Sequence, residues 1–309
     1  MRHVIALSVT ETGTRAALVG FDGSLVYATR RVHGRAAVDP VARRAEELRA
    51  LGRERLGTTA EAVGVALPGG AVALPGLQEA SLREALSRRL GRIPVAVAHD
   101  VRAAGLAEGR VGAGRGTDRF MFVRLDARVD GAIGTGDGVE TGAHGRAGGI
   151  GHIVVRPGGP ACHCGRRGCL DAVASASAIA RGWAAARGAA DADAAGCARA
   201  VADGDPAATG VWRAAVEALA DGLIAAHTLL DCRTVIVGGG LAGAGDTLFA
   251  PLRAAVAERI AFRRLPAVVP ASLGDAAGLA GAGLLARELV TAPPRSGAYP
   301  GNGGVRTCG

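Results

Sequence analysis

One short segment of the chain carries four residues that bind transition metals well. It reads GHIVVRPGGPACHCGRRGCLD and holds His152, Cys162, Cys164 and Cys169. Three thiolates and one imidazole complete a tetrahedral Zn²⁺ shell without an open position, which is typical of a structural site. Because four ligands on one loop must fold back onto a single ion, we expect the loop at 152–169 to be tightly turned and to bind structural zinc.

Two other interpretations of this loop are weaker. A disulfide is disfavoured because a cytoplasmic chain keeps its thiols reduced. His163 is a competing ligand, but it stands between two cysteines and is expected to point away from the metal. Cys197, Cys232 and Cys308 lie outside the cluster, and we expect two buried thiols and one tail residue.

Composition excludes several classes of protein. The 309 residues are 49% hydrophobic and 21% charged, as in an ordinary globular protein. No apolar run approaches the roughly 20 residues that cross a bilayer. The first residues also lack the regions of a signal peptide. We therefore expect a cytoplasmic protein without a membrane partner.

The basic residues restrict the possible classes of protein further. All 36 of them are arginines, and a chain without lysine cannot form a Walker-type GxxxxGK[ST] phosphate loop. The formal charge of +8 raises the option of nucleic-acid binding. However, the arginines are scattered rather than gathered into one stripe, so a nucleic-acid partner is not expected.

The pattern of strands and helices repeats in the two halves of the chain. Each half opens with short strand signals and continues with alternating helices and strands. This organisation predicts an α/β protein with a cleft between two domains. The expected parts are residues 1–118, residues 119–290 with the metal loop, and a disordered tail at 291–309.

The metal loop resembles the signature of the ROK family, the repressors, open reading frames and sugar kinases. That family carries GExGH followed by CxCGxxGCxE, and this chain has GGIGH at 148–152 and CHCGRRGC at 162–169. The resemblance covers nearly the whole chain. It implies the actin/hexokinase-type fold, a duplicated pair of ribonuclease H-like domains around a central cleft, usually as a homodimer. Many family members phosphorylate a hexose or amino sugar with ATP, and others are sugar-sensing repressors.

The resemblance also suggests a catalytic base. In ROK kinases the base is the Asp of an NDxN motif at the end of a strand, and here His99-Asp100-Val101-Arg102 places Asp100 at that position. Without the resemblance, Asp100 would be interpreted as a helix N-cap. Arg102 stands where a sugar hydroxyl would be held. An arginine beside Asp100 is expected to stabilise its carboxylate and lower its basicity.

The family's other sugar contacts are partly kept. His152 is present, and Gly69 lies in a Pro-Gly turn like the one beside the family's sugar. The glutamate of GExGH is replaced by Gly149, and the glutamate after the last cysteine is replaced by Asp171, one methylene shorter. The resemblance therefore implies a sugar or sugar-like ligand bound by Gly69, Arg102, His152 and Asp171.

The phosphate-binding loops depart most from the family pattern. Family kinases begin with DxGGT, whereas residues 8–12 read SVTET and keep only Thr12. The second loop, GTGxGGG in kinases, reads DARVDGA at 126–132. Asp126 and Asp130 put negative charge where phosphate would lie, and side chains crowd the approach to the backbone.

The family's adenosine-side element is kept. A buried strand ends here in Gly238, Gly239 and Gly240, which match the glycine turn of the family. From the residues alone, three glycines after a strand are explained equally by close packing of helix on strand. This element therefore weighs little against the two altered phosphate loops.

These features favour a sugar-kinase homologue that binds a sugar-like ligand in the cleft, with phosphoryl transfer weak or lost. The alternative is an active, glucokinase-like ATP-dependent hexose or amino-sugar kinase with Asp100 as base, and Mg-ATP is expected only in that case. A transcriptional regulator is less favoured, because family repressors carry a DNA-binding region ahead of the first strand, expected here from residue 3. Nothing in the sequence specifies a third option, chemistry on a modified sugar without ATP.

Overall fold

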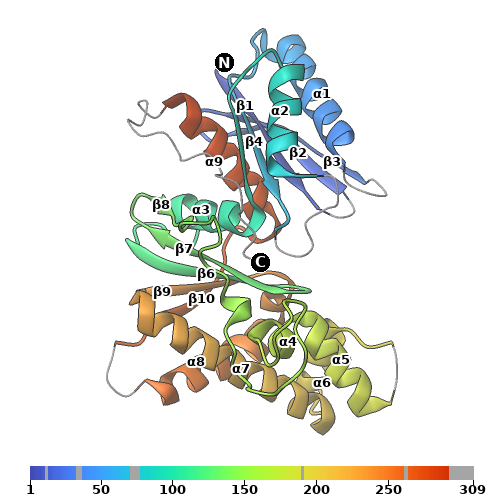
Figure 1. The fold of residues 1–309 in the computed structure, drawn as a ribbon, viewed down its shortest axis with the longest axis vertical. Coiled ribbons are helices and arrows are strands. Elements are labelled where there is room, and N and C mark those ends of the chain that lie inside the picture. The colour runs from blue at the N-terminus through green and yellow to red at the C-terminus, as the bar shows by residue number, and fades with distance from the viewer. Residues whose placement is uncertain (11–12, 33–36, 70–76, 189–190, 261–263, 292–309) are drawn as a thin grey trace, which may run out of the picture.

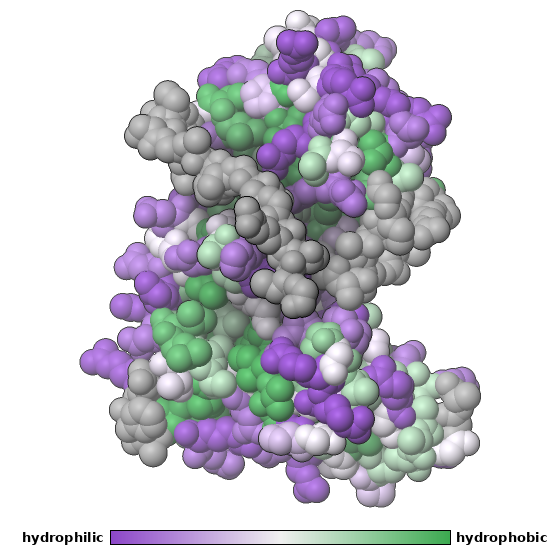
Figure 2. All heavy atoms as spheres, in the orientation of Figure 1, coloured by the Kyte–Doolittle hydropathy of each residue, from purple (hydrophilic) through white to green (hydrophobic). Residues whose placement is uncertain are grey.

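The computed structural model describes residues 1–10, 13–32, 37–69, 77–188, 191–260 and 264–291. Thr12 and residues 292–309 of the expected tail therefore lie outside the described residues. Two mixed sheets, each covered by helices, form the upper and lower halves of the molecule in Figure 1. Figure 2 shows hydrophilic residues gathered over the top and the right side of the upper half.

The first sheet has five strands in the order β3-β2-β1-β4-β5. The first three pair antiparallel, and β4 and β5 extend the sheet in parallel. Its strands are β1 (His3–Val9), β2 (Gly13–Gly20), β3 (Leu25–Val32), β4 (Val63–Leu67) and β5 (Val95–His99). The helices that follow them are α1 (Val38–Leu56), α2 (Glu79–Arg89) and α3 (Asp100–Val111).

The two faces of this sheet bury residues of different size. Ile5 and Leu7 of β1 pack with Leu48 of α1 and Leu82 of α2 in one apolar cluster. The opposite face is built mainly from alanines. Because both faces are covered, β1 and β4 are almost continuously apolar, as expected for strands buried on both sides.

The second sheet repeats the arrangement of the first, in the order β10-β9-β6-β7-β8. Here β6, β7 and β8 pair antiparallel, and β9 and β10 continue in parallel. Its strands are β6 (Arg119–Leu125), β7 (Val129–Thr135), β8 (Gly138–Val139), β9 (Thr234–Gly238) and β10 (Ala267–Pro270). The equal order and direction of the strands confirm the expected duplicated α/β fold.

In the described part of this second half, five α-helices cover the sheet. The longest, α7, begins at Pro206, because the Asp205 carboxylate caps the amides of Ala207 and Ala208 at 2.8 and 2.9 Å. The helices are α4 (Leu170–Ala174), α5 (Ala176–Arg187), α6 (Ala194–Ala202), α7 (Pro206–Leu230) and α8 (Asp246–Arg259). No helix in the described part of the chain is long and apolar enough to cross a membrane.

The C-terminal helix α9 (Ala277–Thr291) packs on the first sheet. It contacts β1, β4 and α3, although our partition of the sequence placed it with the second half. The contact is close, because a Cβ atom on Gly64 would lie 1.8 Å from the Ala282 carbonyl oxygen. Small residues on both elements therefore allow a helix from the chain's end to cover a sheet from its beginning.

Helix α3 lies between the two halves (Figure 1). It packs against α9 on one side and against β6 and β7 on the other. Near its end, the fully buried Glu108 carboxylate accepts the amides of Ala113 and Leu273 at 2.8 Å each. It also accepts the amide and the hydroxyl of Ser272 at 3.2 Å. Glu108 thereby joins the end of α3 to the segment that leads into α9.

Candidate functional site

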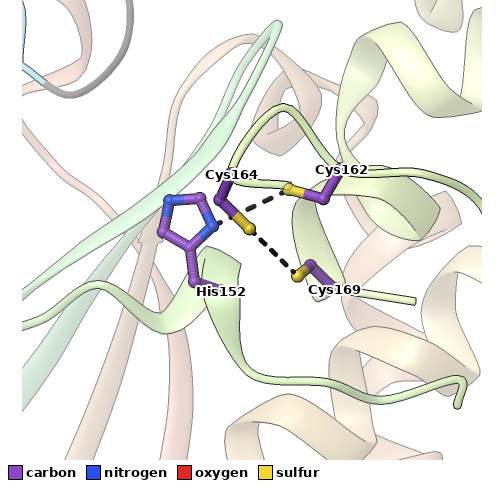
Figure 3. A group of neighbouring side chains, drawn as sticks. All are labelled: His152, Cys162, Cys164 and Cys169. Carbon is purple, nitrogen blue, oxygen red and sulfur yellow. Dashed lines mark hydrogen bonds between the residues drawn. The ribbon is translucent and has the colours of Figure 1, made fainter. Parts of the chain in front are cut away.

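The four expected metal ligands come together on one loop (Figure 3). Their ligand atoms all lie within 4.8 Å of one another. Cys162 Sγ is 3.8 Å from His152 Nδ1, and Cys164 Sγ is 3.6 Å from Cys169 Sγ. This arrangement of three thiols and one imidazole fits a zinc site.

Local backbone geometry explains why the loop closes. His152 ends a short 3₁₀ helix, η2 (Ile150–His152), and Cys169 precedes α4. Gly168 has a positive φ of 73°, and a Cβ atom there would lie 1.6 Å from the Arg156 carbonyl oxygen. Only glycine permits this approach, which brings Cys169 back beside the earlier ligands.

The thiols of the loop differ in acidity. A hydrogen bond from the backbone N–H of Arg166 contributes most to lowering the pKa of Cys164 to about 6. Burial instead raises the pKa of Cys169 to about 12. A bound cation would favour the thiolate form of each ligand. Cys197 and Cys232 are buried free thiols as expected, whereas Cys308 lies outside the described residues.

His163 is not one of the four grouped ligands, but its side chain does not simply point away from the metal loop. With Cys162 and Asp171 it forms a second close group, and its Nδ1 is 3.3 Å from Asp171 Oδ2. The Arg128 guanidinium contacts its ring. Burial, followed by this neighbouring cation, lowers the pKa of His163. His163 therefore links the metal loop to the β6–β7 hairpin.

A cavity of about 760 Å³ lies beside the metal loop, between the turn after β4 and the β6–β7 hairpin. Three of the expected sugar-binding residues, Gly69, His152 and Asp171, line it together. The Asp171 carboxylate accepts the Val129 amide at 2.7 Å, which fixes its position. The cavity therefore lies between the two halves, with Pro68 and Gly69 from the first and the polar side chains of its lining from the second.

Arg102, the fourth expected sugar-binding residue, lies elsewhere. Its guanidinium donates to the Gly145 carbonyl at 3.1 Å, and it is not among the described residues that line the cavity. The prediction that Arg102 stabilises the Asp100 carboxylate is wrong. The two residues stand two positions apart on a helix, and side chains at that spacing do not face each other.

Arg124 of β6 is the arginine that contacts Asp100. Its two terminal nitrogens donate to the two oxygens of the Asp100 carboxylate at 2.7 and 3.1 Å. The Val101 amide donates to the same carboxylate at 2.8 Å. Asp100 is the first residue of α3, and His99 rather than Asp100 is the N-cap, while three hydrogen bonds occupy the Asp100 carboxylate. Burial opposes the charge on Arg124, yet Asp100 and the neighbouring carboxylates raise its pKa.

Two further side chains, of His99 and Asp130, lie close to Asp100, and the sequence alone did not predict that they come together. His99 ends β5, and its Nε2 lies 3.8 Å from Asp100 Oδ1 and 3.7 Å from Asp130 Oδ2. The ring packs beneath the expected sugar turn, where a Cβ atom on Gly69 would lie 1.4 Å from His99 Nε2. Asp130 pairs directly with Arg124 in the β6–β7 register. The register of the β6–β7 hairpin is the one signal in the sequence that could have placed Asp130 beside Arg124.

The glycine turn after β9 adjoins the same hairpin. Gly239 has a φ of 89°, and a Cβ atom on it would lie 2.6 Å from the Leu125 carbonyl oxygen, so close packing requires glycine there. Gly240 begins the 3₁₀ helix η3 (Gly240–Ala244), and its amide donates to the Asp126 carboxylate. The proposed nucleotide-binding role of Gly238, Gly239 and Gly240 therefore involves an amide that already has an anionic partner.

These features together define a hexokinase-type protein, with duplicated α/β halves, a polar cleft and a Cys₃His loop at its edge. The model of the ROK family matches residues 54–289, and the chain belongs to this family. The expected family and fold class are thereby confirmed.

Several relatives of the chain are sugar kinases. A glucokinase from Thermotoga maritima is 34% identical over 231 residues, covering 70% of this chain and 73% of the relative. An N-acetylmannosamine kinase from Escherichia fergusonii is 33% identical over 294 residues, covering 92% and 98%. The crystal structure of a ROK family glucokinase from Streptomyces griseus, in complex with glucose and AMPPNP, has a TM-score of 0.74 and 28% identity. That match covers 93% of this chain and 99% of the other.

Proposed function

We propose that this protein is an ATP-dependent kinase that phosphorylates a hydroxyl of a hexose or amino sugar. The observation that carries the proposal is the cavity in the cleft, where Gly69, His152 and Asp171 lie together beside the acidic start of α3. The glucokinase and N-acetylmannosamine kinase relatives support this function better than a loss of phosphoryl transfer.

The residues of the cavity suit a polar, hydroxylated ligand. Carboxylate and imidazole groups offer hydrogen-bond acceptors and donors to sugar hydroxyls, while the glycine turn lets the backbone approach the ligand. Asp100 stands at the family's position for the base, and Mg-ATP supplies the phosphoryl group. Positioning of the two substrates then accounts for most of the rate, since phosphoryl transfer needs little covalent help from the protein.

The metal in the loop is, in this proposal, a structural zinc ion held by His152, Cys162, Cys164 and Cys169. Four protein ligands leave no open position for a substrate or water, so the ion organises the loop rather than the reaction. The same loop brings His152 and Asp171 to the cavity wall. Metal binding and sugar binding are therefore expected to depend on each other.

A second candidate is a sugar-binding protein that does not transfer phosphate. One observation favours it, because the Gly240 amide at the expected nucleotide turn already donates to Asp126. A nucleotide that binds through this amide would have to displace that carboxylate. Under either candidate, the family resemblance makes a homodimer our expectation, which light scattering on the purified protein would test.

Calorimetry and product analysis separate the two candidates. The zinc-loaded protein is titrated with glucose, other hexoses and amino sugars, each with and without Mg-ATP, and ADP and sugar phosphate are then measured. A kinase binds at least one sugar and forms ADP and sugar phosphate in equal amounts. Sugar binding without either product would reject the kinase and leave the second candidate.

A further inference from the structure

We propose that the side chains of Arg128 and Arg181 bind the phosphate groups of the phosphoryl donor. The inference rests on the proposed kinase function and adds to it the residues that hold the donor. Residues 126–132 read DARVDGA where the family's kinases carry GTGxGGG. Two guanidinium groups here take the place of that glycine-rich backbone.

A kinase requires positive charge close to the phosphates of its donor. Charge is spread over the phosphoryl oxygens during transfer, and electrostatic stabilisation supplies much of the catalysis. The chain contains no lysine, so a permanent side-chain cation at the site must be an arginine. Among the described residues, three arginines line the cavity of about 760 Å³: Arg124, Arg128 and Arg181.

Arg124 is already held by carboxylates. Its terminal nitrogens donate to both oxygens of Asp100 at 2.7 and 3.1 Å, and its Nε lies 3.7 Å from Asp126 Oδ2. Asp130 also faces it. A phosphate could bind Arg124 only by competing with these three carboxylates. Arg124 therefore balances the acidic side chains nearby and leaves the other two arginines for the donor.

Arg128 lies in the turn of the β6–β7 hairpin and reaches the metal loop. Its guanidinium contacts the His163 ring, and its Nη2 lies 3.8 Å from Asp171 Oδ2, which is too long for a hydrogen bond. A guanidinium has five N–H donors, so most of those on Arg128 have no partner among the described residues. Because Asp171 is one of the proposed sugar contacts, a phosphate bound to Arg128 would lie beside the sugar.

Arg181 of α5 presents an unpaired cation to the same cavity. It is exposed, and it forms no hydrogen bond or ion pair with any described residue. Ser177, four positions earlier, also lines the cavity. Side chains at this spacing share one face of a helix, and helical side chains lean toward the N-terminus. A guanidinium and a hydroxyl therefore face the cavity from the first turns of α5.

The start of α5 lies against the hairpin turn, which places both arginines on adjoining parts of the cavity wall. The Ala176 amide donates to the Asp126 carbonyl at 2.8 Å, and the Ala178 amide donates to the Ser175 hydroxyl at 3.2 Å. Because these amides of the first turn are paired, phosphate binding depends on the arginine side chains rather than on the end of the helix. The fork of each guanidinium matches two phosphate oxygens at once.

The two arginines take no part in making or breaking bonds. The sugar hydroxyl oxygen bonds to the γ-phosphorus of ATP, and the hydroxyl proton passes to the base proposed at Asp100. The bond from the γ-phosphorus to the β,γ-bridging oxygen breaks, and ADP leaves with that electron pair. Arg128 and Arg181 hold phosphate oxygens that do not react, so they orient the donor and offset its charge.

The experiment measures binding of Mg-ATP and of inorganic triphosphate to the zinc-loaded protein by calorimetry. Arg128→Ala and Arg181→Ala are compared with Arg213→Ala, which changes an exposed arginine of α7 outside the described cavity lining. We expect each of the first two variants to bind both probes roughly tenfold more weakly, as for loss of a hydrogen bond to a charged group. The control should keep the wild-type affinity, and Arg181→Lys should recover part of the loss.

A second titration separates donor phosphate from an acidic group on the sugar. Glucose and glucuronate are titrated without nucleotide. Unchanged affinity for both sugars in the two alanine variants is the expected result. If the variants lose affinity for glucuronate alone and keep that for Mg-ATP, the arginines bind an acidic sugar and the assignment to the donor is wrong.

Other outcomes also overturn the assignment. Wild-type affinity for both phosphate probes in the two alanine variants would do so, as would failure of the wild type to bind either probe. Weakening in one variant alone would reject the role of the other arginine. If the wild type binds both probes through these arginines but forms no sugar phosphate, the kinase function fails and the phosphate site stands. Should an alanine variant not fold, the glutamine variant at the same position removes the charge, and the same weakening is expected.

Discussion

Replacing Glu108 by glutamine tests how α3 is held to the segment before α9. The Glu108 side chain is fully buried, and its two oxygens accept hydrogen bonds from four donors. Three of these donors are backbone amides, of Ala113, Ser272 and Leu273, so they cannot rotate away. Glutamine has the same shape but replaces one acceptor oxygen by an NH₂ group, which must face at least one of these amides.

Two contributions determine how much Glu108→Gln lowers the free energy of unfolding. A buried amide left without an acceptor costs about 1–3 kcal/mol, and the remaining hydrogen bonds lose the roughly twofold strength that a charged acceptor gives. We therefore expect Glu108→Gln to lower the free energy of unfolding by about 2–4 kcal/mol. The loss should be larger than for most surface substitutions, which stay within about 0.5 kcal/mol.

Urea unfolding followed by circular dichroism measures this difference. Glu84→Gln is the matched control, because the Glu84 side chain is 72% exposed and its contact with Arg88 is 3.8 Å long. The control should unfold at the wild-type urea concentration. Equal unfolding free energies for Glu108→Gln and the wild type would refute the reasoning that these four hydrogen bonds hold α3 in place.

Three further substitutions test other parts of the molecule. Cys164→Ser removes one of four metal ligands, and the purified variant should contain far less zinc by mass spectrometry; a full zinc content would contradict the ligand set. Asp126→Gly frees an amide for phosphate and should tighten Mg-ATP binding several-fold in calorimetry, whereas unchanged affinity would show that Asp126 is no obstacle. Burial opposes the charge of Asp221, but hydrogen bonds from Arg156 and Arg259 outweigh it and lower its pKa. Its stabilisation is therefore full above about pH 4 and is lost as the pH falls through the folded-state pKa. Asp221→Asn should flatten that acid dependence in urea unfolding, and an unchanged slope would contradict the assignment.

Features that depend on residues close together in the sequence could be predicted from the sequence. The four metal ligands are close in sequence, so the loop that joins them was foreseeable from the chain alone. Asp205-Pro206 likewise marked the start of α7. In both cases the residues that determine the structure are neighbours in sequence.

Contacts between distant segments were not predictable in the same way. Arg124 lies on β6 and Asp100 begins α3, so their contact depends on how β6 lies against the start of that helix. The packing of α9 on the first sheet also depends on the route of the chain after β10. Sequence order places α9 beside the second half, whereas its fit against Gly64 places it on the first.

The choice between a kinase and a sugar-binding protein turns on the amide of Gly240. If a nucleotide binds through this amide, it competes with the Asp126 carboxylate, and its binding then includes the cost of displacing Asp126. Such a cost would lower the affinity for Mg-ATP, whereas the sugar contacts proposed for Gly69, His152 and Asp171 do not involve this amide. Slow turnover caused by weak nucleotide binding, with sugar binding kept, is therefore what this contact predicts for a kinase, and relief by Asp126→Gly would locate the cause in the hairpin rather than in the altered residues 8–12.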